Sequence, residues 1–241
     1  MSATRALIFD YGNTLVPFGP VEVGRCDAQW SEQLCTHFGD FDRQQFKDLR
    51  VAQRMRPYVR VDSQWAESDH ADTTQELFIE LYGRPPSTEE TVILLESRRR
   101  SFVDAITAPL DSLATLTALK PHFRLGLVSN FPCGQTIRLS LERTGLIRFL
   151  DAVVVSGEIG YVKPHPLPFT LILEQLQVSP AEAVFVGDNW LADVQGAKRA
   201  GLRAVWFRRW EPPEDFPAQP GDHEPDHIIN EPSALERLFV P

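Results

Sequence analysis

Several features are scarce or absent in this chain, and each absence limits what the protein can be. No apolar run approaches the roughly 18 residues of a membrane-spanning helix, so we expect no association with a membrane. The first residues hold no apolar stretch followed by a cleavage site, so no secretory signal is expected and the expected compartment is the cytoplasm. Cysteine is limited to Cys26, Cys35 and Cys133, which lack metal-ligand spacing and are interpreted as reduced thiols.

Positive charge is also scarce. The formal net charge is −9, so attraction to nucleic acid or to anionic lipid is not expected to drive function. Only four residues are lysines, at positions 47, 120, 163 and 198, and the other basic residues are arginines. Otherwise the composition, 43% hydrophobic and 24% charged, is ordinary for a globular protein. A chain of 241 residues suits one large domain or one domain with an insertion.

Short aliphatic runs alternate with helical patterns over much of the chain. The runs lie at 5–9, 124–129, 151–156, 183–187 and 203–207, with a weaker one at 226–230. They lack strict polar alternation, which is typical of strands covered on both faces. Helical patterns lie among them at 134–147, 166–177, 190–201 and 233–239. This alternation predicts an α/β fold with a doubly wound parallel sheet.

The interval after the first run does not follow the alternation. It contains no convincing strand and predicts four helices, at 26–38, 42–56, 72–82 and 88–105. We therefore expect an α/β core domain made of residues 1–16 and 109–241, and an inserted helical cap domain of residues 17–108. The segment 211–225, rich in proline and acidic residues, is expected to be an exposed loop.

Chemically reactive side chains stand at the ends of four predicted strands. They are Asp10 in LIFDYGNTLV, Ser129 in LGLVSN, Lys163 in GYVKPHP, and Asp188 with Asp193 in VFVGDNWLADVQGAKRAG. Open α/β sheets bind ligands at the carboxyl ends of their strands. One such aspartate is often only a helix cap, but complementary groups after four strands favour a catalytic site.

These four segments resemble the motifs of the haloacid dehalogenase superfamily, which run Asp-x-Asp-x-Thr, Ser or Thr, Lys, and Gly-Asp-x-x-x-x-Asp. The match spans positions 5 to about 210 and resembles the branch with a helical cap that contains phosphoglycolate phosphatase-like and haloacid dehalogenase-like enzymes. The resemblance implies that Asp10 is the nucleophile of an aspartyl-phosphate intermediate and that Lys163 neutralises its charge. It further implies hydroxyl donation from Thr14 and Ser129, with Asn130 beside them as a substrate contact.

The resemblance also implies a bound Mg²⁺. Asp10, Asp188 and a main-chain carbonyl at Gly12 would bind the ion, and Asp193 would support its water shell. This fits the preference of Mg²⁺ for about six hard oxygen ligands, of which proteins commonly supply one or two carboxylates. A cation also reduces the repulsion between a carboxylate nucleophile and a phosphate dianion.

The first motif departs from the pattern at Gly12, because phosphatases of the family carry a second aspartate there. That aspartate protonates the leaving group, and general acid–base help contributes roughly 10²–10⁴ to the rate. One interpretation is a slow phosphatase, or one that borrows an acid such as His37 or His70. Another is a different reaction on the same scaffold. Dehalogenases lack this aspartate but do not need Mg²⁺, whereas phosphonatases use a cap lysine, for which Lys47 is the only candidate. The third is a catalytically silent binding or regulatory protein.

The predicted cap carries a possible substrate contact. Arg43, Lys47, Arg50 and Arg54 recur at helical spacing and share one face of the predicted helix 42–56. This face is either a solvated surface or one that receives a small anionic substrate, for which Arg50 and Arg54 are the candidate contacts. Three tryptophans, Trp30, Trp65 and Trp190, are candidates to line the same pocket, although large aromatic side chains more often fill a core.

Overall fold

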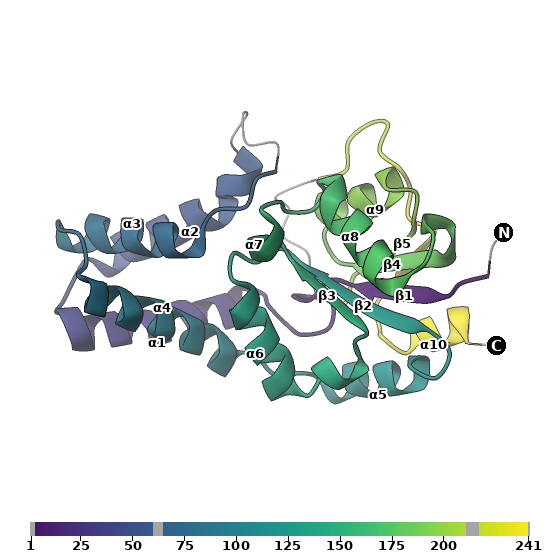
Figure 1. Cartoon of the computed structure of the whole chain (residues 1–241), viewed down its shortest axis with the longest axis horizontal. Coiled ribbons are helices and arrows are strands. Elements are labelled where there is room, and N and C mark those ends of the chain that lie inside the picture. Colours follow the sequence, from purple (N-terminus) through teal and green to yellow (C-terminus); the bar gives the residue numbers. More distant parts are fainter. Residues whose placement is uncertain (1–2, 60–64, 211–216, 241) are drawn as a thin grey trace.

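Six parallel strands form one sheet, and Figure 1 shows it surrounded by helices at one end of the molecule. The structure is a computed structural model that describes residues 3–59, 65–210 and 217–240. Its sheet has the order β3-β2-β1-β4-β5-β6. The strands are β1 (Ala6–Phe9), β2 (Arg124–Ser129), β3 (Ala152–Val155), β4 (Ala183–Gly187), β5 (Arg203–Phe207) and β6 (His227–Ile229). Every neighbouring pair is parallel. This is the strand order of a doubly wound sheet, and it confirms the predicted fold class.

Helices cover both faces of the sheet. One face is covered by α5 (Leu110–Leu119), α6 (Gly134–Thr144) and α10 (Ala234–Phe239), and the other by α8 (Pro166–Leu176) and α9 (Gly196–Arg199). Strand β1 contributes to both cores, because Leu7 and Phe9 lie in the first and Ala6 and Ile8 in the second. Successive residues of a strand point to opposite faces, so a strand buried on both sides is apolar throughout.

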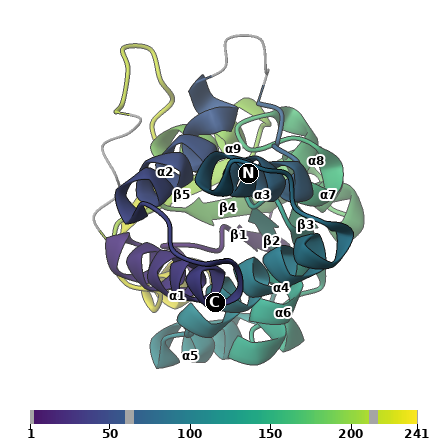
Figure 2. The ribbon, with the colours of Figure 1, turned by 90° about the vertical axis from the view of Figure 1, so that its left-hand side faces the viewer.

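Four helices between β1 and α5 form a separate layer, which Figures 1 and 2 show together at one end of the sheet. They are α1 (Pro20–Phe38), α2 (Arg43–Val59), α3 (His70–Tyr82) and α4 (Thr88–Ala105). A small core of their own holds them together, and its buried members are Trp30, Leu34, Phe46, Leu77, Phe78 and Leu94. We refer to α1–α4 as the helical layer.

Local sequence signals set several of the helix ends. Helix α4 begins with a capping box, in which Ser87 and Glu90 each accept a hydrogen bond from the other's backbone N–H. Helix α3 begins at Asp69, whose side chain accepts a hydrogen bond from the Asp72 amide, and ends at Gly83. Gly83 has a φ of 69°, a left-handed conformation that glycine adopts without steric penalty.

Two helices differ from the sequence-based expectation. Helix α1 begins at Pro20, six residues before the predicted start, and proline at the first helical position is a helix signal in its own right. Helix α5 was not expected at all, since Ser112, Thr115 and Thr117 are weak helix formers. Its buried Leu116 and Leu119 pack in the core against the sheet, so tertiary contacts stabilise the helix.

The remaining elements are short. They are η1 (Ile147–Phe149), α7 (Ser156–Ile159), η2 (Pro180–Glu182) and the π-helix η3 (Trp190–Gln195), which continues into α9 where one helix over 190–201 was expected. Of the expected loop at 211–225, residues 211–216 lie outside the described ranges, and residues 217–225 contain no helix or strand. Within the described ranges, no single helix is long and apolar enough to cross a membrane; α4 and α5 pass that test only as a pair bent by 84°.

Candidate active site

The predicted reactive side chains lie near the point where the strand order of the sheet reverses. Asp10 follows β1 and Asp188 follows β4, and these two strands are neighbours in the sheet. The Asp10 amide donates to the Val186 carbonyl at 2.9 Å, which continues the pairing of β1 with β4. Strand order reverses at this point, and open α/β sheets bind ligands there.

Lys163 is the centre of a buried ionic network. Its side chain is 1% exposed, and Nζ donates to Asp10 Oδ1 at 2.6 Å, to Asp193 Oδ1 at 2.7 Å and to the Val128 carbonyl at 2.9 Å. An ammonium group has three N–H donors, so all three are in use and the charge is fixed in place. Burial alone would lower the pKa of Lys163, but the adjacent Asp10 and Asp193 outweigh it and raise the pKa. The lysine therefore stays protonated.

Three carboxylates meet beside this lysine. Asp10, Asp188 and Asp193 each place an oxygen within 4.8 Å of the others'. Burial raises the pKa of Asp10 to about 6, although Lys163 opposes the shift. Burial, followed by repulsion from Asp10 and Asp193, raises the pKa of Asp188 well above its usual range. Three carboxylates against one ammonium leave two excess negative charges, and this oxygen-only set fits a hard divalent cation such as Mg²⁺.

Asp193 differs from the other two because both of its oxygens are engaged. Oδ1 accepts from Lys163, and Oδ2 accepts from the Asn189 amide at 2.9 Å. A Cβ at Gly187 would lie 2.3 Å from Asp193 Oδ2, so only glycine at that position permits this close approach. Both oxygens of Asp193 are thus held by protein donors, and its predicted support of a metal's water shell stays a prediction.

Two tryptophans support the loop that carries Asp188. Trp206 of β5 donates its indole N–H to the Asp188 carbonyl at 2.8 Å. Its ring packs against Trp190 at a centroid distance of 4.9 Å, and Trp190 donates to Asp222 at 2.7 Å. Trp190 therefore packs beside the loop that carries Asp188, and Trp65 packs against Tyr58. Of the three predicted pocket tryptophans, only Trp30 lines the cavity described below.

Ser129 and Asn130 end β2 next to Lys163. Ser129 is buried as the last residue of the strand. The Asn130 side chain accepts from the Lys163 amide at 2.8 Å and donates to the Lys163 carbonyl at 3.0 Å and to the Tyr58 hydroxyl at 2.9 Å. Asn130 thus fixes the Lys163 backbone and joins the core to the helical layer. Asn130 was predicted only as a substrate contact, and these hydrogen bonds give it a structural role as well.

Thr14 is placed differently from the prediction. It is 3% exposed, and its hydroxyl has no hydrogen-bond partner among the described residues. It borders a small apolar cavity with Phe9, Leu116 and Leu235. These residues belong to the core between the sheet and helices α5 and α10. The Thr14 side chain therefore packs in the core, and its expected hydroxyl donation to substrate stays a prediction.

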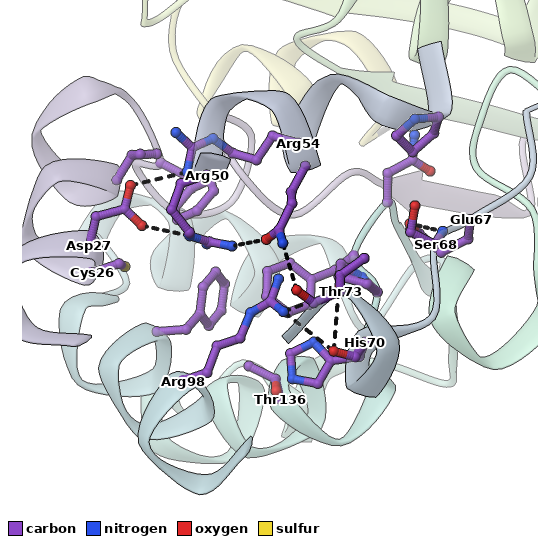
Figure 3. A pocket seen from close by; sticks show the side chains of 18 of the residues that line it. Cys26, Asp27, Arg50, Arg54, Glu67, Ser68, His70, Thr73, Arg98 and Thr136 are labelled. Atoms are coloured by element: carbon purple, nitrogen blue, oxygen red, sulfur yellow. Dashed lines mark hydrogen bonds and ion pairs between the residues drawn. The ribbon is translucent and has the colours of Figure 1, made fainter. Parts of the chain in front are cut away.

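A cavity of about 230 Å³ lies between the helical layer and the loop after β2 (Figure 3). Asn130 and Phe131 border it from the core, and Trp30, Arg50 and Arg54 from the helices. Asp27 accepts from Arg50 Nε and from Arg54 Nη1, both at 3.1 Å. Two of the four residues of the predicted basic face therefore reach this cavity, already paired with a carboxylate.

The other two residues of that face do not line the cavity. Arg43 and Lys47 border a separate groove between α1 and α2, where Arg43 donates to Ser31 at 2.5 Å. Of the candidate acids, His37 is exposed on α1, whereas His70 lines the cavity.

The sequence reasoning missed several residues that line this cavity. Phe18, Tyr58, Glu67, Arg98 and Thr136 belong to no motif and come from five separate segments. The predicted pocket residue Trp30 lies next to one of them. The Arg98 guanidinium carbon is 5.3 Å from its ring centroid, and that of Arg50 is 5.0 Å away. Only the packing of the helices brings these side chains together.

A comparison with known families identifies the chain. A family model described as haloacid dehalogenase-like hydrolase matches residues 4–201. The chain belongs to this family. It is an enzyme, a haloacid dehalogenase-like hydrolase, as the four motifs predicted.

Curated relatives of this hydrolase carry phosphatase names. Ribulose-1,5-bisphosphate 5-phosphatase from Halopiger xanaduensis is 30% identical over 234 residues, which cover 93% of this chain and 95% of the relative. N-acylneuraminate-9-phosphatase from Homo sapiens is 31% identical over 216 residues, which cover 87% and 84% of the two chains.

Solved structures share the fold at lower identity. A HAD phosphatase from Thermococcus onnurineus has a TM-score of 0.69 at 24% identity, with 98% of each chain covered. A 2-haloacid dehalogenase from Pseudomonas syringae has a TM-score of 0.74 at 21% identity, with 98% and 97% covered. A HAD-hydrolase from Bacillus subtilis bound to magnesium has a TM-score of 0.70 at 19% identity, with both chains fully covered. The fold is therefore common to phosphatases and dehalogenases and does not by itself choose between them.

Proposed function

We propose that this hydrolase is a Mg²⁺-dependent phosphatase that acts on a small phosphorylated metabolite through an aspartyl-phosphate on Asp10. The observation that carries the proposal is the buried cluster of Asp10, Asp188 and Asp193, which has one ammonium for three carboxylates. The phosphatase names of the two relatives that match most of this chain support the same reaction.

The chain's own residues account for the positions of the reacting groups. The Asp10 carboxylate attacks phosphorus, an Asp10 oxygen–phosphorus bond forms, and the ester oxygen leaves with its electron pair. Lys163 holds Asp10 in place and offsets negative charge at the phosphoryl group. The Ser129 hydroxyl donates to a phosphoryl oxygen. Water then hydrolyses the acyl-phosphate, which releases inorganic phosphate and restores Asp10.

Asp10, Asp188 and the Gly12 carbonyl would hold the proposed Mg²⁺, and Asp193 would support its water shell. When bound, the ion supplies positive charge that reduces the repulsion between the carboxylate nucleophile and a phosphate dianion. Asp193 orients both Lys163 and the Asn189 amide, so it supports the site without being free to act as a proton donor.

We also propose that residues 17–108 act as a cap over a core made of residues 1–16 and 109–241. Two side-chain contacts join the proposed cap to the core near the site. Asn130 donates to the Tyr58 hydroxyl, and Ser156 donates to Glu67 Oε2 at 2.5 Å. A closed cap excludes water from the phosphoryl group and strengthens each electrostatic contact there.

The leaving group receives no proton from position 12, because Gly12 has no side chain. His70 is a poor substitute, since burial, and then the charges of Arg98 and Arg50, lower its pKa to about 3. At neutral pH its imidazole is uncharged and has no proton of suitable acidity to give. The proposed enzyme should therefore favour esters whose alcohols leave without protonation.

The rival reactions have less support in the site. A phosphonatase needs a cap lysine near the nucleophile, but Lys47 is exposed and borders the groove between α1 and α2. A dehalogenase has no need of a metal, and so gives no reason for three clustered carboxylates. A catalytically silent binding protein would have no chemical need of all four reactive residues, Asp10, Ser129, Lys163 and Asp188.

Hydrolysis of p-nitrophenyl phosphate tests the proposal. Activity should require Mg²⁺ and disappear in excess EDTA. Asp10→Asn should lower kcat by about 10³-fold or more, as expected when a nucleophile is removed, and Asp188→Asn should chiefly raise the Mg²⁺ concentration needed. Asp48→Asn, an exposed position on α2, is the control and should change neither.

A panel with 2-chloropropionate and phosphonoacetaldehyde separates the alternatives. Equal phosphate hydrolysis in EDTA, or activity that persists in Asp10→Asn, would contradict the proposed mechanism. Turnover of the haloacid or the phosphonate without phosphate ester hydrolysis would replace it with the corresponding rival, and no turnover of any of the three would leave the silent protein.

A further inference from the structure

The cavity beside the proposed phosphate site has more positive than negative groups at its walls. Arg50, Arg54 and Arg98 line it, and Asp27 is shared by the first two. Glu67, the other acidic residue at the wall, accepts from Ser156, and burial raises the pKa of Glu67. In the parts of the chain that the structure describes, Arg98 forms no ion pair. The cavity is therefore suited to a negatively charged ligand.

Arg98 is held in a defined orientation by neutral groups. Its Nη1 donates to Thr74 Oγ1 at 2.5 Å and to Thr73 Oγ1 at 3.2 Å, and its guanidinium lies over the Trp30 ring. All of its described hydrogen bonds come from Nη1, whereas a guanidinium has five N–H donors. Burial, and next the nearby Arg50 charge, lower the pKa of Arg98. An anion in the cavity would stabilise this cation.

Further polar groups at the cavity wall have no partner in the described structure. Thr136 is 1% exposed and its hydroxyl makes no hydrogen bond, and neither ring nitrogen of His70 makes one. Figure 3 shows both side chains on the same side of the cavity as Arg98. Buried polar groups nearly always have a hydrogen-bond partner, so these atoms mark a place that a polar ligand group completes.

One residue of the cavity wall is bonded to the proposed phosphate site. Asn130 lines it and is bonded to both the amide and the carbonyl of Lys163, whose ammonium holds Asp10. The walls also include the apolar rings of Phe18 and Phe102. At about 230 Å³ the cavity is smaller than the roughly 300–1,000 Å³ typical of sites for drug-sized ligands. It therefore suits a small metabolite.

We infer that the substrate carries a second anionic group at the end away from the scissile phosphate, and that Arg98 and Thr136 bind this group. The inference rests on the proposed function for the position of the phosphate. The second group is a carboxylate or a second phosphate, because either accepts several N–H and O–H donors at once. The apolar rings contact the carbon chain between the two ends.

Binding to an inactive form tests this inference without requiring turnover. In Asp10→Asn, calorimetric affinities are measured for 3-phosphoglycerate, glycerol 1,3-bisphosphate and glycerol 3-phosphate, which share a three-carbon chain but end in a carboxylate, a phosphate and a hydroxyl. One of the two probes that carry a second anionic group should bind about 10- to 100-fold more tightly than glycerol 3-phosphate, the ratio expected from hydrogen bonds to a charged group. The probe that binds more tightly shows whether the second anionic group is a carboxylate or a phosphate.

Variants on this background assign the preference to residues. Arg98→Met should reduce the affinity ratio to near one, Arg98→Lys should retain part of it, and Thr136→Val should lower it severalfold without loss of any protein hydrogen bond. Arg100→Met, an exposed position on the same helix, should leave the ratio unchanged. In the otherwise wild-type enzyme, Arg98→Met should raise KM for the more tightly bound of the two probes with a second anionic group. The exposed Arg100→Met should change neither that KM nor the hydrolysis of p-nitrophenyl phosphate.

The outcomes separate the two proposals. Equal affinities for all three probes, in a protein that hydrolyses p-nitrophenyl phosphate, would overturn the anion site and leave the phosphatase standing. If the tighter binding of one probe over glycerol 3-phosphate persists in a protein without phosphatase activity, the phosphatase proposal is wrong and the anion site stands. If Arg98→Met and Thr136→Val lower the affinity for every probe equally, both residues are structural and the inference is wrong.

Discussion

Gly12 leaves space that the ring of Phe18 partly occupies. A Cβ added at Gly12 would lie 3.1 Å from Phe18 Cβ and 3.4 Å from Phe18 Cδ1. Phe18 is held by a 2.9 Å hydrogen bond from its amide to Asn13 Oδ1 and by ring contact with Phe102. An aspartate at position 12 therefore requires Phe18 to move, in addition to supplying the missing acid.

The acid–base position can be tested with Phe18 as a second variable. Gly12→Asp alone should change alkyl-phosphate hydrolysis only modestly, because Phe18 must move before the carboxylate can face the leaving group. Gly12→Asp with Phe18→Ala should approach the roughly 10²–10⁴ gain of general acid–base catalysis, with a smaller gain for p-nitrophenyl phosphate. The control is Phe18→Ala alone. A gain in that control equal to the gain in the double variant would contradict this account.

His70 should give the folding free energy a measurable pH dependence. Its pKa is lowered to about 3, chiefly by burial and then by Arg98 and Arg50, against 6.5 for an ordinary histidine. The unfolded chain therefore binds a proton below about pH 6.5 that the folded protein does not bind, so stability is lost as the pH falls. Urea unfolding at pH 7.5 and 5.5 should show wild type losing about 1 kcal/mol more than His70→Gln. Exposed His37→Gln should behave like wild type, and identical pH slopes in all three would contradict the assignment.

At the scale of elements, the turn from β4 into η3 places the acidic residues of the site. Asn189 begins η3 and its side chain accepts from the Ala192 amide, while Trp206 on the neighbouring β5 donates to the Asp188 carbonyl. Neither contact involves a reactive group directly. Both fix the backbone from which Asp188 and Asp193 extend, and such supporting contacts commonly affect metal affinity by 10- to 100-fold.

Removing the Trp206 donor should therefore weaken metal binding. In Trp206→Phe, the Mg²⁺ concentration for half-maximal p-nitrophenyl phosphate hydrolysis should rise about tenfold, while activity at saturating Mg²⁺ falls little. Trp210→Phe is the matched control, since Trp210 packs against Phe207 farther along the chain. An unchanged Mg²⁺ titration in Trp206→Phe would show that the hydrogen bond to Asp188 does not hold the ligand in place.

The strands could be predicted from the sequence because short apolar runs between turn residues are typical of strands buried on both faces. Each predicted strand agrees with an observed one to within about one residue, as for 183–187 and β4. Helix α5 was missed because its stability comes from burial of Leu116 and Leu119 and not from its composition. The proximity of Asp10 and Asp188 could be predicted because both directly follow strands, β1 and β4. Lys163 follows α7 and Asp193 lies within η3, so their meeting with Asp10 depends on connections that the spacing of strands does not give.

The positions of several side chains near the site could not be predicted from the sequence, for one physical reason. Thr14 lies in the loop after β1, where one step along the chain turns a side chain from the site into the core, and sequence spacing does not reveal that turn. Arg98 and Thr136 lie on α4 and α6, and their common place at the cavity depends on how those helices pack. Helical periodicity predicts which face is buried but not which neighbour it meets.

Across the whole molecule, the proposed metal site opposes folding unless its charge is balanced. Asp10, Asp188 and Asp193 place three carboxylates around Lys163, and burial penalises each unbalanced charge. The same carboxylates come from the ends of β1 and β4 and from η3, so the repulsion acts between elements of the central sheet. A bound cation should therefore stabilise the entire α/β core.

Thermal unfolding with and without Mg²⁺ tests this coupling between site and fold. A ligand at 100 times its Kd stabilises the folded state by about 2.7 kcal/mol, which for a chain of this length raises Tm by roughly 5–10 °C. Asp188→Asn should abolish this rise, because it removes a proposed ligand, yet in EDTA it should be at least as stable as wild type, because it also removes a repelling charge. Asp48→Asn, exposed on α2, should keep the full Mg²⁺ response. If Mg²⁺ raised the Tm of Asp188→Asn as much as that of wild type, the ion would be binding elsewhere. If Asp188→Asn were less stable than wild type in EDTA, the carboxylate would be contributing favourable contacts that outweigh its repulsion, and the charge argument for the metal would be lost.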